Sequence, residues 1–171
     1  MKNQFIKEAI NKRKQKNQYR TLQLIPDQSI NFSSNNYLGL ANHPLLKQRA
    51  QEYIDRYGVG ATASRLVCGN HIYHKIIENK IAQFLGTETA LLFNSGFQAN
   101  ATIIEALADR DTTIIADRAC HSSLLFGAVA SRSRLVRFHH NNLDHLEEIL
   151  KNISTKKKLV IVESIYSMEG D

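Results

Sequence analysis

The stretch A-L-L-F-N-S-G-F-Q-A-N, residues 90–100, contains the local pattern from which the fold can be worked out. Its apolar run at 91–93 predicts a short buried strand, and a helical pattern begins at Phe97. The Ser95-Gly96 turn between them leaves backbone N–H groups free at the start of the helix. Such a helix start binds a phosphate or carboxylate through its N–H donors and its dipole. From these residues alone, an ordinary capping serine and turning glycine explain the stretch equally well.

Downstream of this stretch, strand-like and helix-like segments alternate. Apolar strands are predicted at 113–116, 135–138 and 159–162, with helices at 121–131 and 143–151 between them. This order predicts an α/β fold with a mostly parallel sheet covered by helices on both faces. Ligands bind beyond the carboxyl ends of such strands, so the polar segments that leave strands are expected to meet at one edge. These segments are 95–97, 117–123 and 163–171.

Upstream of residue 90, the pattern predicts a polar helix over 3–18 and a short strand at 30–33. Two further helices are predicted, one entered at Pro44 and one ending at Gly86. We therefore expect an N-terminal basic helical arm and loop over residues 1–40, followed by an α/β domain over residues 41–171.

The net charge of +6 comes entirely from the first 20 residues, which carry seven basic side chains against Glu8. A basic arm of this kind binds nucleic acid or an anionic ligand such as coenzyme A. The alternative is a solvated amphipathic helix that packs through Phe5, Ile6 and Ile10. No nucleic-acid motif or aromatic interleaving is visible, so no nucleic-acid partner is expected.

Composition and cysteine usage predict a cytoplasmic protein with no membrane partner. No apolar run approaches the roughly 20 residues that span a bilayer. The first residues contain no apolar signal core. Cys68 and Cys120 are far apart and predict reduced thiols, not a disulfide framework.

Several candidate side chains follow predicted strands. His121 stands where an imidazole stacks on or titrates against a bound ring, although a histidine there also serves as a plain helix cap. Ser95, His121 and Asp117 have the composition of a hydrolase triad, but the G-x-S-x-G elbow is absent. His71 and His74 lie three apart with no completing carboxylate or cysteine, so no metal site is expected.

Two other features leave alternatives open. The small-residue loop that ends at Ser64 and Arg65 lets a backbone approach a ligand or a second subunit closely, or it is a flexible loop with a surface arginine. His139 and His140 are expected to end a strand in solvent.

Five motifs that follow one another along the chain carry a resemblance to a known family. Together they look like the first half of an α-oxoamine synthase, a pyridoxal-phosphate (PLP) enzyme of the aspartate-aminotransferase fold. The S-G-F and F-S-S-N-x-Y-L-G-L strings are most similar to the 8-amino-7-oxononanoate synthase branch, whereas N-N-Y-L-G-L-A-N-H-P also resembles the glycine C-acetyltransferase branch. The motifs are N-F-S-S-N-N-Y-L-G-L (31–40), G-V-G-A-T-A-S-R-L-V-C-G (58–69), L-L-F-N-S-G-F-Q-A-N (91–100), A-D-R-A-C-H-S-S-L (116–124) and E-S-I-Y-S-M-E-G-D (163–171).

The resemblance implies an acyltransferase of biotin synthesis. Enzymes of this branch condense a pimeloyl thioester with L-alanine to 8-amino-7-oxononanoate, CO2 and CoA. The implied partners are therefore an acyl-CoA or acyl-carrier thioester and an amino acid, with a homodimer expected for the complete enzyme. In that case residues 41–171 form part of the PLP-binding large domain.

The resemblance also implies a set of residues that bind the cofactor. Gly96 and Phe97 would donate backbone N–H groups to its phosphate, and His121 would stack on its pyridine ring. Ser167 would bond near its phenolic oxygen, and Glu163 would support that edge of the site.

Substrate and interface residues follow from the same resemblance. Asn35 would lie by the substrate carboxylate together with His121, and Arg20 would contact the acyl substrate. Ser64 and Arg65 would belong to a loop near the dimer interface.

Some parts of the family's site have no counterpart in the quoted motifs. The family's ring-nitrogen aspartate, its following histidine and its Schiff-base lysine all come after the last motif. None of this chain's lysines has a matching Ser/Thr-rich context. The expectation is a truncated or split N-terminal portion, inactive alone and working with a complementing C-terminal fragment. The alternative is a non-catalytic remnant or anion-binding module.

Overall fold

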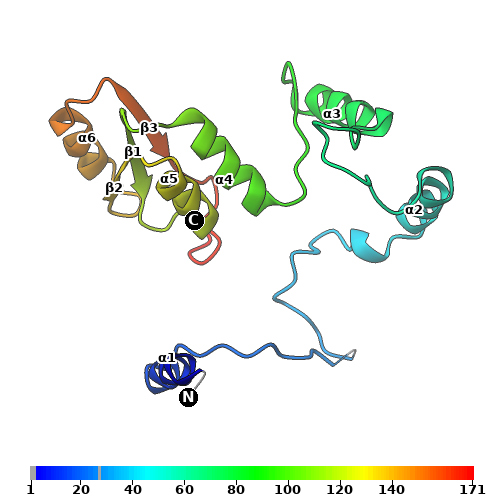
Figure 1. Cartoon of the computed structure of the whole chain (residues 1–171), viewed down its shortest axis with the longest axis horizontal. Helices are drawn as coiled ribbons and strands as arrows, with labels where there is room; N and C mark the ends of the chain where they lie inside the picture. Colours follow the sequence, from blue (N-terminus) through cyan, green and yellow to red (C-terminus); the bar gives the residue numbers. More distant parts are fainter. Residues whose placement is uncertain (1–2, 27) are drawn as a thin grey trace. The chain divides into compact units, whose positions relative to one another are not determined.

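The computed structural model describes residues 3–26 and 28–171 (Figure 1). These residues divide into two compact units. One unit extends to Gly60, and the other runs from Ala61 to Asp171. The sequence-based division at residue 40 stays a prediction.

The first unit contains α1 (Gln4–Gln15), the short 3-10 helix η1 (Leu40–Asn42) and α2 (Pro44–Tyr57). Pro44 occupies the first turn of α2, where its missing N–H costs no helical hydrogen bond. The strand predicted at 30–33 is wrong, because these residues form a turn. The Ser33 N–H donates to the Asn31 side chain at 2.9 Å, and such local bonds compete with strand pairing.

The second unit contains a three-stranded parallel sheet with the strand order β2-β1-β3. Ile114 in the central strand is in register with Leu135 on one side and Leu159 on the other. The predicted strand–helix alternation and parallel pairing are confirmed. The elements are α3 (Ile72–Leu85), α4 (Gly96–Leu107), β1 (Thr112–Asp117), α5 (Ser122–Ala130), β2 (Arg134–Phe138), α6 (Leu143–Asn152) and β3 (Lys157–Ile161).

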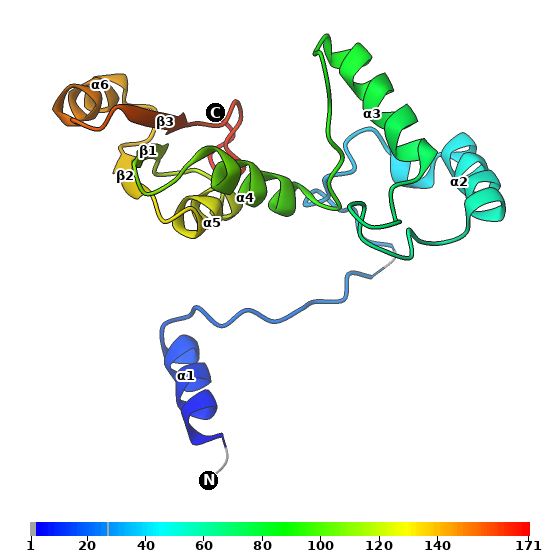
Figure 2. The ribbon, with the colours of Figure 1, turned by 45° about the horizontal axis from the view of Figure 1, so that its top comes forward.

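Helices cover both faces of the sheet, as predicted. Helices α4 and α5 pack side by side on one face, where Ile104 and Ala128 join Ile114 in one buried cluster (Figure 1). Helix α6 lies on the other face, where its apolar side packs against a second cluster formed by Ile115 and Phe138 (Figure 2). All six residues of β1 are buried, because this strand has a neighbour on each side and helices above and below.

A glycine sets the close contact between α4 and α5. A Cβ added at Gly127 would lie 2.6 Å from the backbone oxygen of Ala101, so any other residue would push the helices apart. This contact also fixes how the starts of the two helices lie beside each other.

The strand predicted at 91–93 is also wrong, because the segment is an extended loop. Its backbone groups bond to side chains instead of a neighbouring strand. The Leu92 N–H donates to Glu78 at 2.8 Å, and Arg65 donates to the Leu92 carbonyl at 3.3 Å. The apolar pattern identified an extended segment but not its partners.

Candidate functional site

The segments that follow β1 and β3 meet around a small cavity of about 190 Å³. The predicted cofactor residues His121, Glu163 and Ser167 all line this cavity. The expectation that polar segments converge at the carboxyl edge of the sheet is thereby confirmed for these two segments. The other lining residues are Ala119, Cys120, Ser122 and Met168.

His121 is fixed through both its backbone and its ring. Its backbone N–H donates to Glu163 Oε1 at 2.5 Å, which ties the segment after β1 to the segment after β3. Its Nδ1 accepts the Ser123 N–H at 3.2 Å and thereby caps α5. The two interpretations of this histidine are therefore compatible, because a ring that caps a helix also lines the cavity.

The start of α4 supplies free backbone donors close to α5. Ser95 Oγ accepts the Gln98 N–H at 3.1 Å, so the serine does cap the helix. Among the described residues, no acceptor binds the N–H groups of Gly96 and Phe97. Apart from its chain neighbours and the backbone of its own helix, no atom of the described residues lies within 4 Å of a Cβ added at Gly96, so this end of the helix is open.

Two contacts bring the start of α4 alongside the start of α5. The Phe97 and Phe126 rings lie 5.6 Å apart, and Asn100 bonds to Ser123 at 3.0 Å. The third predicted segment therefore neighbours the residues that line the cavity. Backbone N–H groups suit a phosphate, and an imidazole suits an aromatic ring.

A buried aspartate anchors the segment after β1. Asp117 is fully buried and accepts three hydrogen bonds, from Ala119 N at 2.7 Å, His140 Nδ1 at 2.8 Å and Asn141 N at 3.0 Å. Burial raises the pKa of Asp117, but the bonds from Ala119, Asn141 and His140 outweigh burial and hold this pKa below its usual value.

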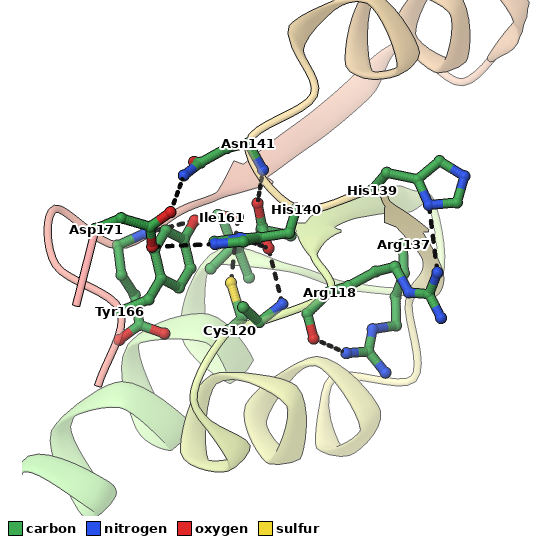
Figure 3. Close-up of polar contacts among 12 residues, drawn as sticks. Arg118, Cys120, Arg137, His139, His140, Asn141, Ile161, Tyr166 and Asp171 are labelled. Atoms are coloured by element: carbon green, nitrogen blue, oxygen red, sulfur yellow. Dashed lines mark hydrogen bonds and ion pairs between the residues drawn. The ribbon is translucent and has the colours of Figure 1, made fainter. Parts of the chain in front are cut away.

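His140 extends this network to the segment 163–171. Its Nε2 contacts Asp171 at 3.1 Å, and its ring meets Tyr166 edge-on with the centroids 4.6 Å apart (Figure 3). The hydrogen bond to Asp117 raises the pKa of His140 above its ordinary value, and the bond to Asp171 adds to this effect. The expectation that His140 ends a strand in solvent is wrong, since its side chain is 26% exposed and bridges two carboxylates.

Cys120 lines the cavity but is a poor nucleophile. Its thiol is buried and lies 3.4 Å from the Ile161 carbonyl. Burial, helped by the nearby Glu163 and Asp117 carboxylates, raises the pKa of Cys120 to about 11.

Arg65 is engaged in an ion pair and is not a flexible surface side chain. Its guanidinium makes two bonds to Glu78, at 2.7 and 3.1 Å, and one to Asn70 at 2.9 Å. The Arg65 bonds, together with the Leu92 N–H, lower the pKa of Glu78 to about 2. Ser64 and Arg65 line a separate pocket, and their assignment to an interface stays a prediction.

Some candidate residues do not join the site. Arg20 and Asn35 are exposed residues of the first unit, and their substrate contacts stay predictions. The hydrolase triad does not form, because Asp117 bonds to His140 and not to His121. Among the described residues, no group of three or more His, Cys, Asp or Glu side chains is placed to hold a metal ion.

Comparison with known proteins identifies the family. Residues 27–171 match the model of a family described as aminotransferase class I and II. The chain belongs to this family, and the resemblance drawn from the five motifs is confirmed.

Individual relatives show which members of this family the chain resembles. The chain is 41% identical to 8-amino-7-oxononanoate synthase of Thermoanaerobacter pseudethanolicus over 180 residues, which is 98% of this chain and 46% of the relative. The structure of the Francisella tularensis 8-amino-7-oxononanoate synthase is 28% identical with a TM-score of 0.70, over 85% of this chain and 40% of that one. A variant of serine palmitoyltransferase from S. paucimobilis with a bound PLP–myriocin aldimine gives a TM-score of 0.85 at 26% identity, over 99% of this chain and 46% of that one.

The chain thus spans less than half the length of the curated relatives that it matches. Within the part that the structure describes, no helix is both long and apolar enough to cross a membrane.

Proposed function

We propose that this chain forms the N-terminal part of the cofactor site of a PLP-dependent acyltransferase of the 8-amino-7-oxononanoate synthase type. The observation that carries the proposal is the convergence of His121, Glu163 and Ser167 around one cavity, next to the open start of α4. The likeness to 8-amino-7-oxononanoate synthases supports the same branch.

The residues present fit PLP by the chemistry of their donors. The backbone N–H groups of Gly96 and Phe97, which have no acceptor in the part of the chain that the structure describes, suit the phosphate, and the His121 ring suits the pyridine. The Ser167 hydroxyl and the Glu163 carboxylate stand on the same cavity as polar partners. When bound, PLP supplies an electron sink for the bond broken at the α-carbon of the amino acid.

In this proposal the chain's own residues bind and orient the cofactor and the substrates. Glu163 fixes the His121 backbone, so the ring stays at the carboxyl edge of the sheet. His121 holds the carboxylate of the amino acid, proposed to be L-alanine. The assignments of Asn35 to that carboxylate and of Arg20 to the pimeloyl thioester stay predictions. The products are 8-amino-7-oxononanoate, CO2 and CoA.

The imine-forming lysine that PLP chemistry requires is not assigned to any lysine of these 171 residues. We therefore expect no acyl transfer from this chain alone and expect activity when a lysine-bearing C-terminal part is supplied. The homodimer, with Ser64 and Arg65 near its interface, and the cytoplasmic location stay predictions.

Cofactor binding is tested by equilibrium dialysis of PLP against the chain. We expect PLP to bind more tightly than pyridoxal, which lacks the phosphate, and inorganic phosphate to compete. Gly96→Pro removes one N–H donor at a helix position that tolerates proline, and Ser95 already has the extended backbone that proline requires before it. Gly96→Ala keeps the donor and serves as the matched control.

The expected result is a PLP dissociation constant that rises about two- to tenfold in Gly96→Pro, from the loss of one hydrogen bond, and stays unchanged in Gly96→Ala. Equal binding of PLP and pyridoxal, or no binding of either, would contradict the proposal.

The reaction is tested by CoA release from pimeloyl-CoA with L-alanine. The assay is run on the chain alone and on the chain mixed with the C-terminal half of the Thermoanaerobacter relative. Release from the mixture supports the proposed branch, and release from the chain alone overturns the expectation that it lacks the required lysine. Release only from acetyl-CoA with glycine supports a glycine C-acetyltransferase. Phosphate-dependent PLP binding without release from either pair supports the non-catalytic anion-binding module.

A further inference from the structure

The His121 ring is held by two groups of one buried residue. Its Nδ1 accepts the Ser123 backbone N–H at 3.2 Å and lies 2.7 Å from the Ser123 Oγ. Ser123 is fully buried in the first turn of α5, so no bulk water replaces these contacts. The orientation of the ring is therefore set by a residue that does not line the cavity.

Asn100 sets the direction of the Ser123 hydroxyl hydrogen. The Asn100 Nδ2, on α4, donates to Ser123 Oγ at 3.0 Å. Because the oxygen accepts this bond, its own hydrogen is available for His121 Nδ1. Nδ1 then faces two donors, the backbone N–H and the hydroxyl. A nitrogen that accepts from donors carries no proton, so the ring proton stands on Nε2.

We propose that Asn100 and Ser123 are positioning residues that hold His121 as the neutral tautomer protonated at Nε2, with its ring in one orientation. The inference rests on the proposed function for the use of that ring. A neutral imidazole brings no second positive charge next to a protonated pyridine, and its Nε2–H remains a donor for the carboxylate of the amino acid.

The test is the protonation of His121 in the chain without cofactor, read from long-range proton–nitrogen NMR spectra of the labelled histidine rings. The signals of His121 among the seven histidines are assigned by their absence from His121→Asn. The expected result for the unmodified chain is a bare Nδ1 and a protonated Nε2. A proton on Nδ1 would overturn the inference.

Asn100→Asp replaces the side-chain donor at position 100 with an acceptor of the same shape. The carboxylate accepts the Ser123 hydroxyl hydrogen, which leaves a lone pair of the hydroxyl facing Nδ1. We expect the ratio of Nδ1-protonated to bare rings to rise at least about tenfold, as the reversal of one hydrogen bond predicts. Asn100→Ala, which removes the donor without a charge, is the second variant and gives a smaller rise. Asn79→Asp makes the same chemical change at an exposed position of α3 and leaves His121 unchanged.

Cofactor binding separates this inference from the proposed function. PLP affinity is expected to fall about two- to tenfold in Asn100→Asp and to stay constant in Asn79→Asp. If neither the unmodified chain nor any variant binds PLP, the proposed function fails while the protonation result stands. If PLP binds all of them equally, or Asn100→Asp leaves the ratio of Nδ1-protonated to bare rings unchanged, the positioning role is refuted and the proposed function survives.

Discussion

Replacing Asp117 with Asn is expected to destabilise the second unit strongly. The carboxylate is fully buried, and its two oxygens share three donors. Oδ1 accepts from Ala119 N and His140 Nδ1, and Oδ2 accepts from Asn141 N. Asparagine keeps the shape but turns one of these oxygens into an NH2 group, which donates and cannot accept.

The cost follows from which oxygen is lost. The better placement keeps the amide oxygen at Oδ1 and points the NH2 group at the Asn141 N–H, which then lacks an acceptor. A buried donor without a partner costs about 1–3 kcal/mol. The two remaining bonds lose the assistance of the negative charge, worth roughly 1 kcal/mol each. The neutral asparagine avoids the cost of burying a charge, which offsets part of this loss. The net destabilisation is therefore about 2–4 kcal/mol.

The assay is urea unfolding followed by far-UV circular dichroism at neutral pH, because the chain contains no tryptophan. With a typical slope of about 2 kcal/mol per molar urea, the midpoint should fall by about 1–2 M. Asp111→Asn, at an exposed position just before β1, is the matched control and should change stability by less than about 0.5 kcal/mol. Equal midpoints for the two variants would refute the idea that Asp117 anchors this loop.

Two further predictions concern titratable groups of the same edge. Because the pKa of His140 is raised in the folded protein, the stability it contributes is present below about pH 6.5 and is lost as the pH rises through its folded value. The urea midpoint of the unmodified chain should therefore approach that of His140→Gln between pH 6 and pH 8; a constant gap would show that the imidazole charge is irrelevant. Cys120, with its pKa of about 11, should react with a disulfide reagent at pH 8 on the order of 10²-fold more slowly than the exposed Cys68. Cys68→Ser should leave only the slow phase, and two equal phases in the unmodified chain would contradict this.

The alternation of strands and helices could be predicted because it depends on local periodicity. Continuous apolar runs identify β1 to β3, and apolar stripes of period 3.6 identify α3 to α6, all to within a few residues. The edge where His121, Glu163 and Ser167 meet follows from topology, since parallel strands all end on one side. No side-chain contact has to be known for either conclusion.

The two wrong strands show what local periodicity leaves out. Residues 91–93 have a strand pattern, but Glu78 and Arg65 take the backbone groups of Leu92 from 14 and 27 positions upstream. At 30–33, a bond between Asn31 and Ser33 favours a turn. A strand depends on which groups reach its backbone, and that information lies elsewhere in the chain.

The polar networks lie beyond sequence reasoning for the same reason. His140 follows β2, and nothing local shows that its two nitrogens reach carboxylates 23 and 31 positions away. Asn100 resembles any polar residue of an amphipathic helix until α4 and α5 are packed together at Gly127. These contacts depend on which side chains the packed elements bring together, and a local sequence pattern does not contain that information.

Two hydrogen-bond networks act on different parts of the segment that follows β1. Asp117 and His140 fix the backbone that leaves β1 and join it to the segment 163–171, whereas Asn100 and Ser123 act on the His121 ring alone. The first network is therefore expected to govern stability and the second to govern protonation. Since the two share no hydrogen bond among the described residues, Asp117→Asn should lower the urea midpoint without protonating His121 Nδ1. Asn100→Asp should protonate His121 Nδ1 without lowering the urea midpoint. Opposite outcomes for the two variants would distinguish the anchoring role of Asp117 from the positioning role of Asn100.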